Sequence, residues 1–337
     1  MDKKLYMRGL VAQKWYNFTE GLVYALTVRP TPENLIYERK IKYGDEKLQY
    51  INTYCKKGTE NQKKPLLIYI HGGSWLSGIT EMRNRYIALW AEKGYFTASV
   101  SYCYAPQKVF PFAIQDCFSA IDFIVDNAEK WNLDLENVIL AGESAGGYFI
   151  SHVASAMSDF TLYEKNELTF QSRNNFKVRA MVSLSGCFSL ERLSDETKEQ
   201  SKFPDLATMF KSFFGMKIED FKNWLKTEEG KLASPVVTKN FPPVFMAWAT
   251  RDKLRFEAFD MANDLREFNI PYRLFKIDDI SAQHAWSIVP LFQKSRECFE
   301  DAYKFCEKYI EKYTKRYIKN RCTQRYNGLF IFISLAF

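Results

Sequence analysis

A serine between two glycines, placed where an apolar run meets a helical pattern, constrains this chain more than any other feature. Residues 142–146 read Gly-Glu-Ser-Ala-Gly, and they follow an apolar run at residues 138–141 that is typical of a buried strand. The positions two residues before and after such a serine leave almost no room for a Cβ atom, a demand that only glycine meets. The pattern therefore predicts a strained strand-to-helix turn that exposes the hydroxyl of Ser144.

A second glycine motif lies upstream. Residues 71–75 read His-Gly-Gly-Ser-Trp and come directly after another apolar run, residues 65–70. Backbone amides that point at a developing negative oxygen stabilise a tetrahedral intermediate, and the loss of one such donor costs about 3 kcal/mol of barrier. We therefore predict an oxyanion hole made of the N–H groups of Gly72 and Gly73, with Ala145 of the serine turn as the third donor.

An acid and a base follow downstream, each after a predicted strand. Residues 242–250 read as a strand that precedes Asp252, and residues 272–277 read as the next strand, which precedes a short loop and His284. Open α/β sheets place their sites at the carboxyl ends of their strands. The order Ser144, Asp252, His284 is the one expected of a hydrolase triad built on such a sheet.

The choice of base is narrow because the chain has three histidines. His71 belongs to the upstream glycine loop, where we expect it to shape the turn. His152 lies eight residues after Ser144 on the same predicted helix, which is about 12 Å along the axis and too far to reach the hydroxyl. His284 remains as the candidate base.

The choice of acid is less restricted. Asp278 and Asp279, in the loop before His284, are alternatives to Asp252. The position of Asp252 at the end of a strand favours it. Glu143, beside the candidate nucleophile, is expected to brace the turn rather than to titrate in the reaction.

Taken in order, these motifs resemble the α/β-hydrolase superfamily, and within it the hormone-sensitive-lipase-like and small-carboxylesterase branch (α/β-hydrolase fold-3). The resemblance implies a mainly parallel eight-stranded sheet flanked by helices, with a small helical lid. It also implies a serine hydrolase that cleaves carboxylic esters through an acyl-enzyme on Ser144. The matching pieces lie between about residues 35 and 310, at residues 71–73, 101–106, 110–113, 116–117, 142–147, 252–254 and 284–286.

The upstream motif departs from the branch in one respect. Where the branch has three glycines after the histidine, this chain has two, followed by Ser74 and Trp75. This variant resembles arylformamidases and polysaccharide-deacylating relatives, so an amide or formamide hydrolase is the first alternative. A non-catalytic binding protein on the same fold is the second, although it predicts the loss of a triad residue or donor glycine, and all are present.

Three aromatic residues flank the predicted centre, namely Trp75, Tyr148 and Trp286. They are candidates for the substrate pocket, and core packing explains each of them equally well. The sequence has no cluster of histidines and carboxylates at metal-ligand spacing. We therefore expect no metal and no cofactor, and a small-molecule ester or amide as the partner.

The remaining organisation is that of one domain with additions. Alternating strands and helices predict a single α/β-hydrolase domain at residues 1–312. A helix at about residues 5–26 is placed to form part of a cap over the active-site mouth, and an aromatic-rich insertion at about residues 188–234 is placed as a lid. Residues 313–337 form a basic and then apolar tail.

Charge and cysteine content indicate which partners and which cellular compartment to expect. The net charge is +7, and the segment from Lys312 onward has six basic and no acidic residues, which leaves about +1 for the rest and gives no sign of a nucleic-acid groove. Seven cysteines lack a C-x-x-C pattern. Without a signal-peptide pattern or an apolar run of about 20 residues, we expect a cytoplasmic, thiol-reduced protein with no stable membrane insertion.

Overall fold

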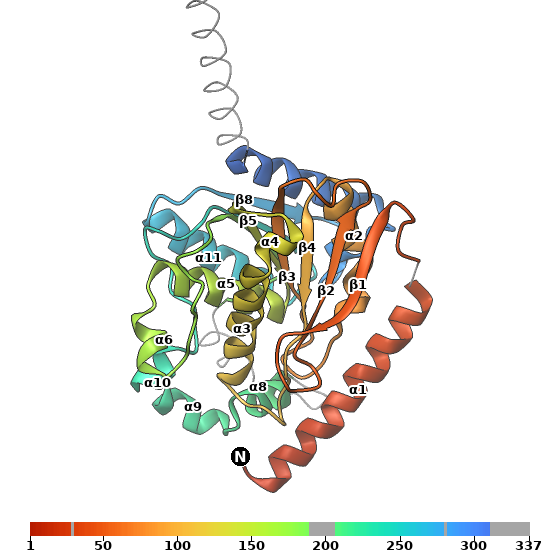
Figure 1. Ribbon diagram of the computed structural model, residues 1–337. Coiled ribbons are helices and arrows are strands. Elements are labelled where there is room, and N and C mark those ends of the chain that lie inside the picture. Colours follow the sequence, from red (N-terminus) through yellow and green to blue (C-terminus); the bar gives the residue numbers. More distant parts are fainter. Residues whose placement is uncertain (28–29, 189–205, 280–281, 311–337) are drawn as a thin grey trace, which may run out of the picture.

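The computed structural model describes residues 1–27, 30–188, 206–279 and 282–310. Eight strands form one sheet in the order β1-β2-β4-β3-β5-β6-β7-β8 (Figure 1). The pairs β1–β2 and β2–β4 are antiparallel, and every other neighbouring pair is parallel. The predicted α/β-hydrolase fold with a mainly parallel eight-stranded sheet is therefore confirmed. The strands are β1 (Leu35–Lys42), β2 (Tyr50–Lys56), β3 (Lys64–Ile70), β4 (Phe96–Val100), β5 (Leu133–Glu143), β6 (Val178–Leu184), β7 (Val244–Ala249) and β8 (Tyr272–Ile277).

The central strands are mostly apolar because helices cover both faces of the sheet. Along β3, Leu66 and Ile68 point to one face and pack with residues of α3, α5 and α11, while Leu67 and Tyr69 point to the other and pack with α2 and the helix at residues 293–310. This alternation follows the two-residue period of a strand. The covering helices are α2 (Asn84–Glu92), α3 (Phe112–Asp126), α5 (Ala145–Ser158) and α11 (Arg255–Glu267).

The insertion predicted at about residues 188–234 is helical where it is described. It contains α8 (Leu206–Phe214), α9 (Ile218–Trp224) and α10 (Glu228–Lys231). Phe210, Phe214 and Phe221 are buried against one another, with ring centroids 4.4–4.9 Å apart. The aromatic spacing that marked this segment is therefore explained by the small core that α8 and α9 share. The first part of the insertion, residues 189–205, and the tail at 313–337 lie outside the described residues.

The helix predicted near the N-terminus is present as α1 (Lys3–Thr27), which runs along the outside of the molecule (Figure 1). Its inner face approaches α8 so closely that a Cβ atom on Gly9 would lie 2.7 Å from Ser212 Oγ. Gln13 Nε2 also donates to the carbonyl of Ala105 at 3.1 Å, in the loop after β4. Helix α1 and α8 therefore lie side by side over the loops at the carboxyl edge of the sheet.

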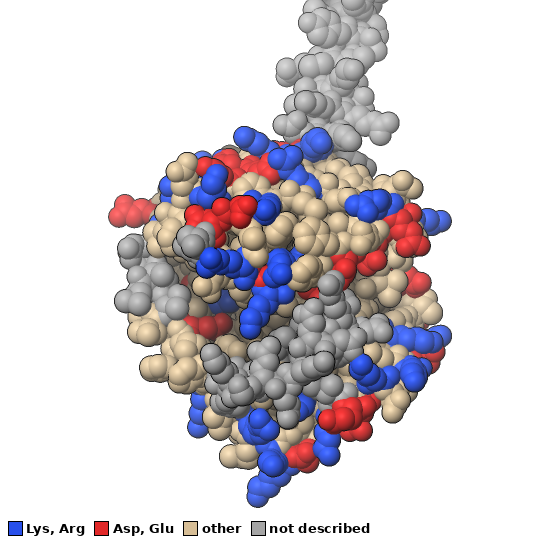
Figure 2. Space-filling view, turned by 180° about the vertical axis from the view of Figure 1, so that it is seen from behind, with Lys and Arg blue, Asp and Glu red and all other residues tan. Residues whose placement is uncertain are grey.

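The surface of the described residues carries charges of both signs. On the face shown in Figure 2, basic and acidic side chains are interspersed between uncharged ones. In the described part of the chain, no helix combines the length and the apolar character needed to cross a bilayer.

Two histidines are fully buried in this fold. The ring centroids of His152, on α5, and Tyr148 are 4.4 Å apart, and Nδ1 of His152 is hydrogen-bonded to Tyr163 Oη at 3.0 Å. Burial lowers the pKa of His152 to about 3. Because the folded pKa is below that of the unfolded chain, the unfolded state binds more protons as the pH falls through 6.5, and stability falls with it.

We therefore expect acid to destabilise the protein through His152. Between pH 7 and pH 5 the buried neutral imidazole should lower the free energy of unfolding by about 2 kcal/mol. The reason is that the pKa of this ring in the unfolded chain, 6.5, lies 1.5 units above pH 5. In urea unfolding at the two pH values, His152→Phe should lose this much of the pH dependence. Tyr163→Phe, which keeps the buried imidazole, should retain it, and equal pH dependence in wild type and His152→Phe would refute the assignment.

Candidate active site

The serine turn is as tight as its glycines indicate. Strand β5 ends at Glu143 and α5 begins at Ala145, so Ser144 alone makes the junction, with φ 53° and ψ −122°. This left-handed φ is strained for a residue that is not glycine. A Cβ atom on Gly146 would lie 2.0 Å from the carbonyl oxygen of Ile70, at the end of β3. The turn is therefore pressed against the neighbouring strand, where only glycine fits.

Three predicted side chains meet at this turn. His284 Nε2 lies 2.8 Å from Ser144 Oγ. His284 Nδ1 lies 3.0 and 3.1 Å from the two carboxylate oxygens of Asp252. Because a carboxylate only accepts, the ring proton is on Nδ1, which leaves the lone pair of Nε2 facing the serine hydroxyl. The structure thus brings together residues that are 108 and 32 positions apart in the chain.

Asp252 is held as a buried anion. Its side chain is fully buried, and Oδ1 accepts the amide of Leu254 at 2.9 Å. Burial raises the pKa of this carboxyl, but the hydrogen bond and charge of His284, together with Ser185 and the Leu254 amide, outweigh it and lower the pKa. The alternative Asp278 is exposed and pairs with Lys276 at 2.9 Å. The geometry therefore favours Asp252 over Asp278.

Glu143 joins the serine turn to the upstream glycine loop. Its side chain is 1% exposed. Oε1 accepts the amide of Gly72 at 2.9 Å and Nε of Arg83 at 2.5 Å, and Oε2 accepts the hydroxyl of Tyr69 at 2.6 Å. Arg83 also lies 3.8 Å from Glu20 of α1. These contacts brace the loop against the turn, as predicted for Glu143, and they connect the turn to α1.

The same contacts change the set of candidate oxyanion donors. The amide of Gly72 is already bonded to Glu143, so the prediction that it faces substrate is wrong. Within the described part of the loop, no protein acceptor is recorded for the amides of Gly73 and Ser74. Gly73 and Ser74 both have positive φ, at 137° and 54°, which turns this stretch of backbone away from strand geometry. Gly73 and Ala145 remain candidates, and Ser74 replaces Gly72.

His71 shapes this loop, as predicted. It is fully buried, and its Nδ1 donates to the carbonyl of Gly72 at 2.7 Å. Its ring stacks on Tyr102 at 4.6 Å between centroids, and the Tyr102 hydroxyl donates to the His71 carbonyl at 2.8 Å. Burial and the nearby charge of Arg83 lower the pKa of His71 to about 4. The ring is therefore neutral at neutral pH.

The three candidate pocket aromatics have different surroundings. Trp75 is 4% exposed and stacks on Phe213 of α8 at 5.2 Å, and Tyr148 is fully buried and donates to the carbonyl of Ala233 at 2.9 Å. Both are core residues of the described structure, so the packing explanation is favoured over the pocket explanation. Trp286 is partly buried near His284 and stacks on Phe292 at 5.2 Å. Its role stays a prediction.

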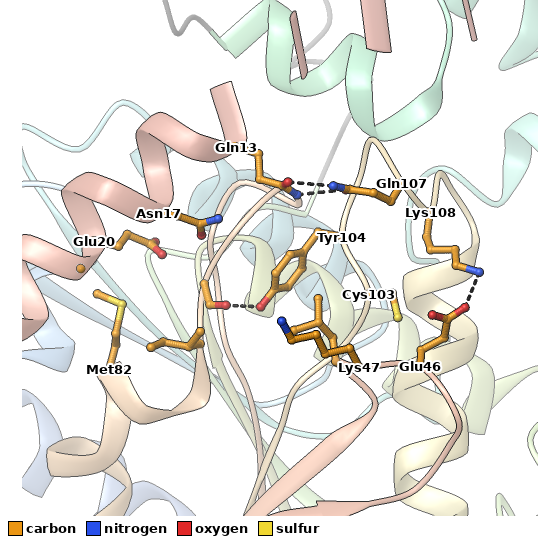
Figure 3. A pocket seen from close by; sticks show the side chains of 14 residues that line it. Gln13, Asn17, Glu20, Glu46, Lys47, Met82, Cys103, Tyr104, Gln107 and Lys108 are labelled. Carbon is orange, nitrogen blue, oxygen red and sulfur yellow. Dashed lines mark hydrogen bonds and ion pairs between the residues drawn. The ribbon is translucent and has the colours of Figure 1, made fainter. Parts of the chain in front are cut away.

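A cavity of about 490 Å³ lies under α1, beside the loops at residues 44–48 and 103–108 (Figure 3). Gln13, Asn17 and Glu20 line it from α1, and Tyr104 lies opposite, with its hydroxyl bonded to the carbonyl of Gly78. None of the triad residues lines it. The candidate chemistry is therefore located by the triad geometry and not by this cavity.

No group of three or more histidine, cysteine, aspartate or glutamate side chains among the described residues is arranged to hold a metal ion.

The partners of Glu143 could not be predicted from the sequence. Arg83 and Tyr69 lie 60 and 74 positions away from it in the chain, and no local pattern connects them. A lone arginine near a predicted helix otherwise reads as part of a solvated face.

Comparison with known proteins identifies the family. The family model described as BD-FAE matches residues 51–256, which is more than half of the chain. The chain belongs to the BD-FAE family. Its sheet and its structural neighbours give this BD-FAE protein an α/β-hydrolase fold.

Individual relatives are distant. Esterase LipC of Mycobacterium tuberculosis is 26% identical over 64% of this chain, which spans about half (51%) of the length of LipC. An arylesterase of Saccharolobus solfataricus is 27% identical over 81% of this chain and 86% of its own. The crystal structure of esterase B from Lactobacillus rhamnosis has a TM-score of 0.77 at 18% identity, covering 93% of this chain and 97% of that one.

The close approach of Gly146 to β3 yields a stability prediction. We expect Gly146→Ala to lower the free energy of unfolding by about 3 kcal/mol or more, because the added methyl meets a backbone oxygen that cannot move away. Gly21→Ala is the control, since a Cβ at Gly21 in α1 meets nothing within 4 Å. It should be neutral or stabilise by up to about 1 kcal/mol. Urea unfolding measures both, and similar values would contradict the packing argument.

The buried ion pair between Arg83 and Glu143 yields a second stability prediction. We expect Arg83→Met to lower the free energy of unfolding by about 3–5 kcal/mol, because it leaves the Glu143 carboxylate buried without its cation. Arg273→Met is the control, since the Arg273–Asp301 pair is 2.6 Å long but Arg273 is 56% exposed. This control should lose less than about 1 kcal/mol. If thermal and urea unfolding gave equal losses for the two variants, Glu143 would not depend on Arg83.

Proposed function

We propose that this protein is a serine hydrolase that cleaves carboxylic esters, with Ser144 as nucleophile, His284 as general base and Asp252 as the residue that orients the base. The observation that supports this proposal is the continuous chain of hydrogen bonds from Ser144 Oγ through His284 to Asp252. If Ser144 had only a structural role in the glycine turn, a partly exposed histidine at its hydroxyl would not be required. The names of the relatives as esterases agree with it.

The reaction follows from where the protons lie. His284 Nε2 accepts the hydroxyl proton as Ser144 Oγ attacks the acyl carbon, and the ring then carries a positive charge. Asp252, held as an anion in a buried position, stabilises that charge and fixes the tautomer, an effect of about 10⁴ in rate. His284 next protonates the leaving alcohol. Water, deprotonated by the same nitrogen, then releases the acid from Ser144.

The oxyanion is proposed to bind the amides of Gly73, Ser74 and Ala145. Ala145 is the first residue of α5, so its N–H has no acceptor within the helix and lies at the positive end of the helix dipole. Glu143 supports the other two donors indirectly. By bonding the amide of Gly72, it fixes the loop that carries Gly73 and Ser74 beside the nucleophile.

We further propose a reducing compartment such as the cytoplasm as the place of action. Six cysteines, at positions 55, 103, 117, 187, 298 and 306, are buried and unpaired in the described residues. Burial raises the pKa of the thiols of Cys117, Cys187 and Cys306, which keeps them protonated and unreactive.

The triad is tested with p-nitrophenyl acetate and butyrate, together with one aryl formamide. We expect hydrolysis of the esters by the wild type, a loss in kcat of roughly 10⁶ in Ser144→Ala and of about 10⁴ in Asp252→Asn. A fluorophosphonate probe should label the wild type and not Ser144→Ala.

Asp278→Asn is the matched control for the acid and should keep wild-type kcat, because Asp278 is exposed and paired with Lys276. Preference for the formamide would move the substrate class to amides while leaving the triad in place. Unchanged labelling of Ser144→Ala would refute the assignment of Ser144 as nucleophile. A wild type that hydrolyses none of the substrates and is not labelled would favour a non-catalytic binding protein.

A further inference from the structure

The outward face of α1 is apolar, which is unusual for a helix on the surface of a protein. Five large side chains on it are about half exposed or more, with values of 51–67%. Singly scattered apolar side chains on a surface need no explanation, but a contiguous set does. These residues, named here the outer stripe, are Met7, Val11, Trp15, Phe18 and Leu22.

The outer stripe is continuous along the helix. Its members are spaced by 4, 4, 3 and 4 residues, which places them one above another on a single side of an α-helix. At 1.5 Å per residue the stripe is about 22 Å long. The opposite side of the helix is the buried one, where Leu5, Gly9 and Ala12 face the body of the protein. The stripe therefore plays no part in holding α1 to the fold.

Every charged residue beside the outer stripe is basic. Lys3, Lys4, Arg8 and Lys14 are exposed, and each lies three or four residues from a stripe member, which makes them neighbours on the helix surface. No ion pair is recorded for any of the four within the described residues. Asp2 precedes the helix and accepts the Leu5 amide at 2.8 Å.

The acidic residue within α1 points the other way. Glu20 lies 3.8 Å from Arg83, whose guanidinium is buried beside the serine turn. The outward face of α1 thus combines an apolar stripe, one tryptophan and unpaired cations. This combination is typical of helices that lie in the interface of a bilayer, with the apolar side chains among the acyl chains and the cations at lipid headgroups.

We propose that the outer stripe of α1 binds peripherally to membranes that contain anionic phospholipids. Charge complementarity decides the occupant. A second copy of this chain, joined through the same face by a two-fold axis, would bring the four cations of one copy against those of the other, which is unfavourable. An anionic lipid surface instead attracts each of these cations, and it needs no matching groove. The proposal is independent of the hydrolase activity.

The test is co-sedimentation of the full chain with vesicles of phosphatidylcholine and phosphatidylserine in equal parts, and with vesicles of phosphatidylcholine alone. We expect wild type to bind the mixed vesicles, with binding that weakens as salt is raised. Trp15→Gln/Phe18→Gln should weaken binding by about tenfold or more, since two large side chains no longer enter the lipid. Lys4→Gln/Arg8→Gln/Lys14→Gln should do the same on the mixed vesicles alone.

The matched control is Phe268→Gln/Leu274→Gln, which removes two exposed apolar side chains at the end of α11 and on β8, at the sheet edge opposite β1. This variant should bind as wild type does. Thermal unfolding establishes that each variant is folded. Wild type that stays in the supernatant, or a Trp15→Gln/Phe18→Gln variant that binds as wild type, would overturn the proposal. A dimer that this variant dissociates on size exclusion would assign the face to a second copy and overturn it equally.

Discussion

The contact between the end of β3 and the serine turn is the constraint on which the site depends. The carbonyl of Ile70 occupies the space where a side chain on Gly146 would stand, and a Cβ on Gly72 would lie 2.6 Å from the carbonyl of Glu143. With the two backbones this close, the amides after β3 and the hydroxyl of Ser144 share one small volume. The strain of the turn is sustained because β5 and α5 are fixed in the core on either side of it.

Electrostatics keep the two halves of this contact in place. The Glu143 carboxylate is buried, yet it accepts from a backbone amide, a guanidinium and a phenol, so its charge is compensated on several sides. A carboxylate with fewer donors would be costly in such a position. Asp252 is similarly buried but compensated by a histidine whose own side chain is 41% exposed. One anion thus braces the framework, while the other is bonded to a ring that solvent can reach.

Local patterns, one topological rule and the family resemblance were sufficient to predict the fold and the three side chains that meet at the serine turn. The glycine turn at Ser144 is local, and Asp252 and His284 follow strands whose carboxyl ends share an edge in a parallel sheet. The partners of Glu143 were not predictable, because Arg83 and Tyr69 reach it only through the folded chain. The same gap explains the error at Gly72. Its amide looked free in the sequence because nothing nearby showed that Glu143 would occupy it.

The two sides of α1 reverse the usual arrangement of a surface helix. A helix that packs on a protein through large apolar side chains normally presents charge to water. Here Leu5, Gly9 and Ala12 face the body and Glu20 adds an ionic contact, so the inner side attaches α1 without help from the outer stripe. The five large apolar side chains of the outer stripe face away from the body. A sequence retains such a face at a cost in solubility, and a lipid surface that buries it accounts for both the apolar stripe and the sign of the charges beside it.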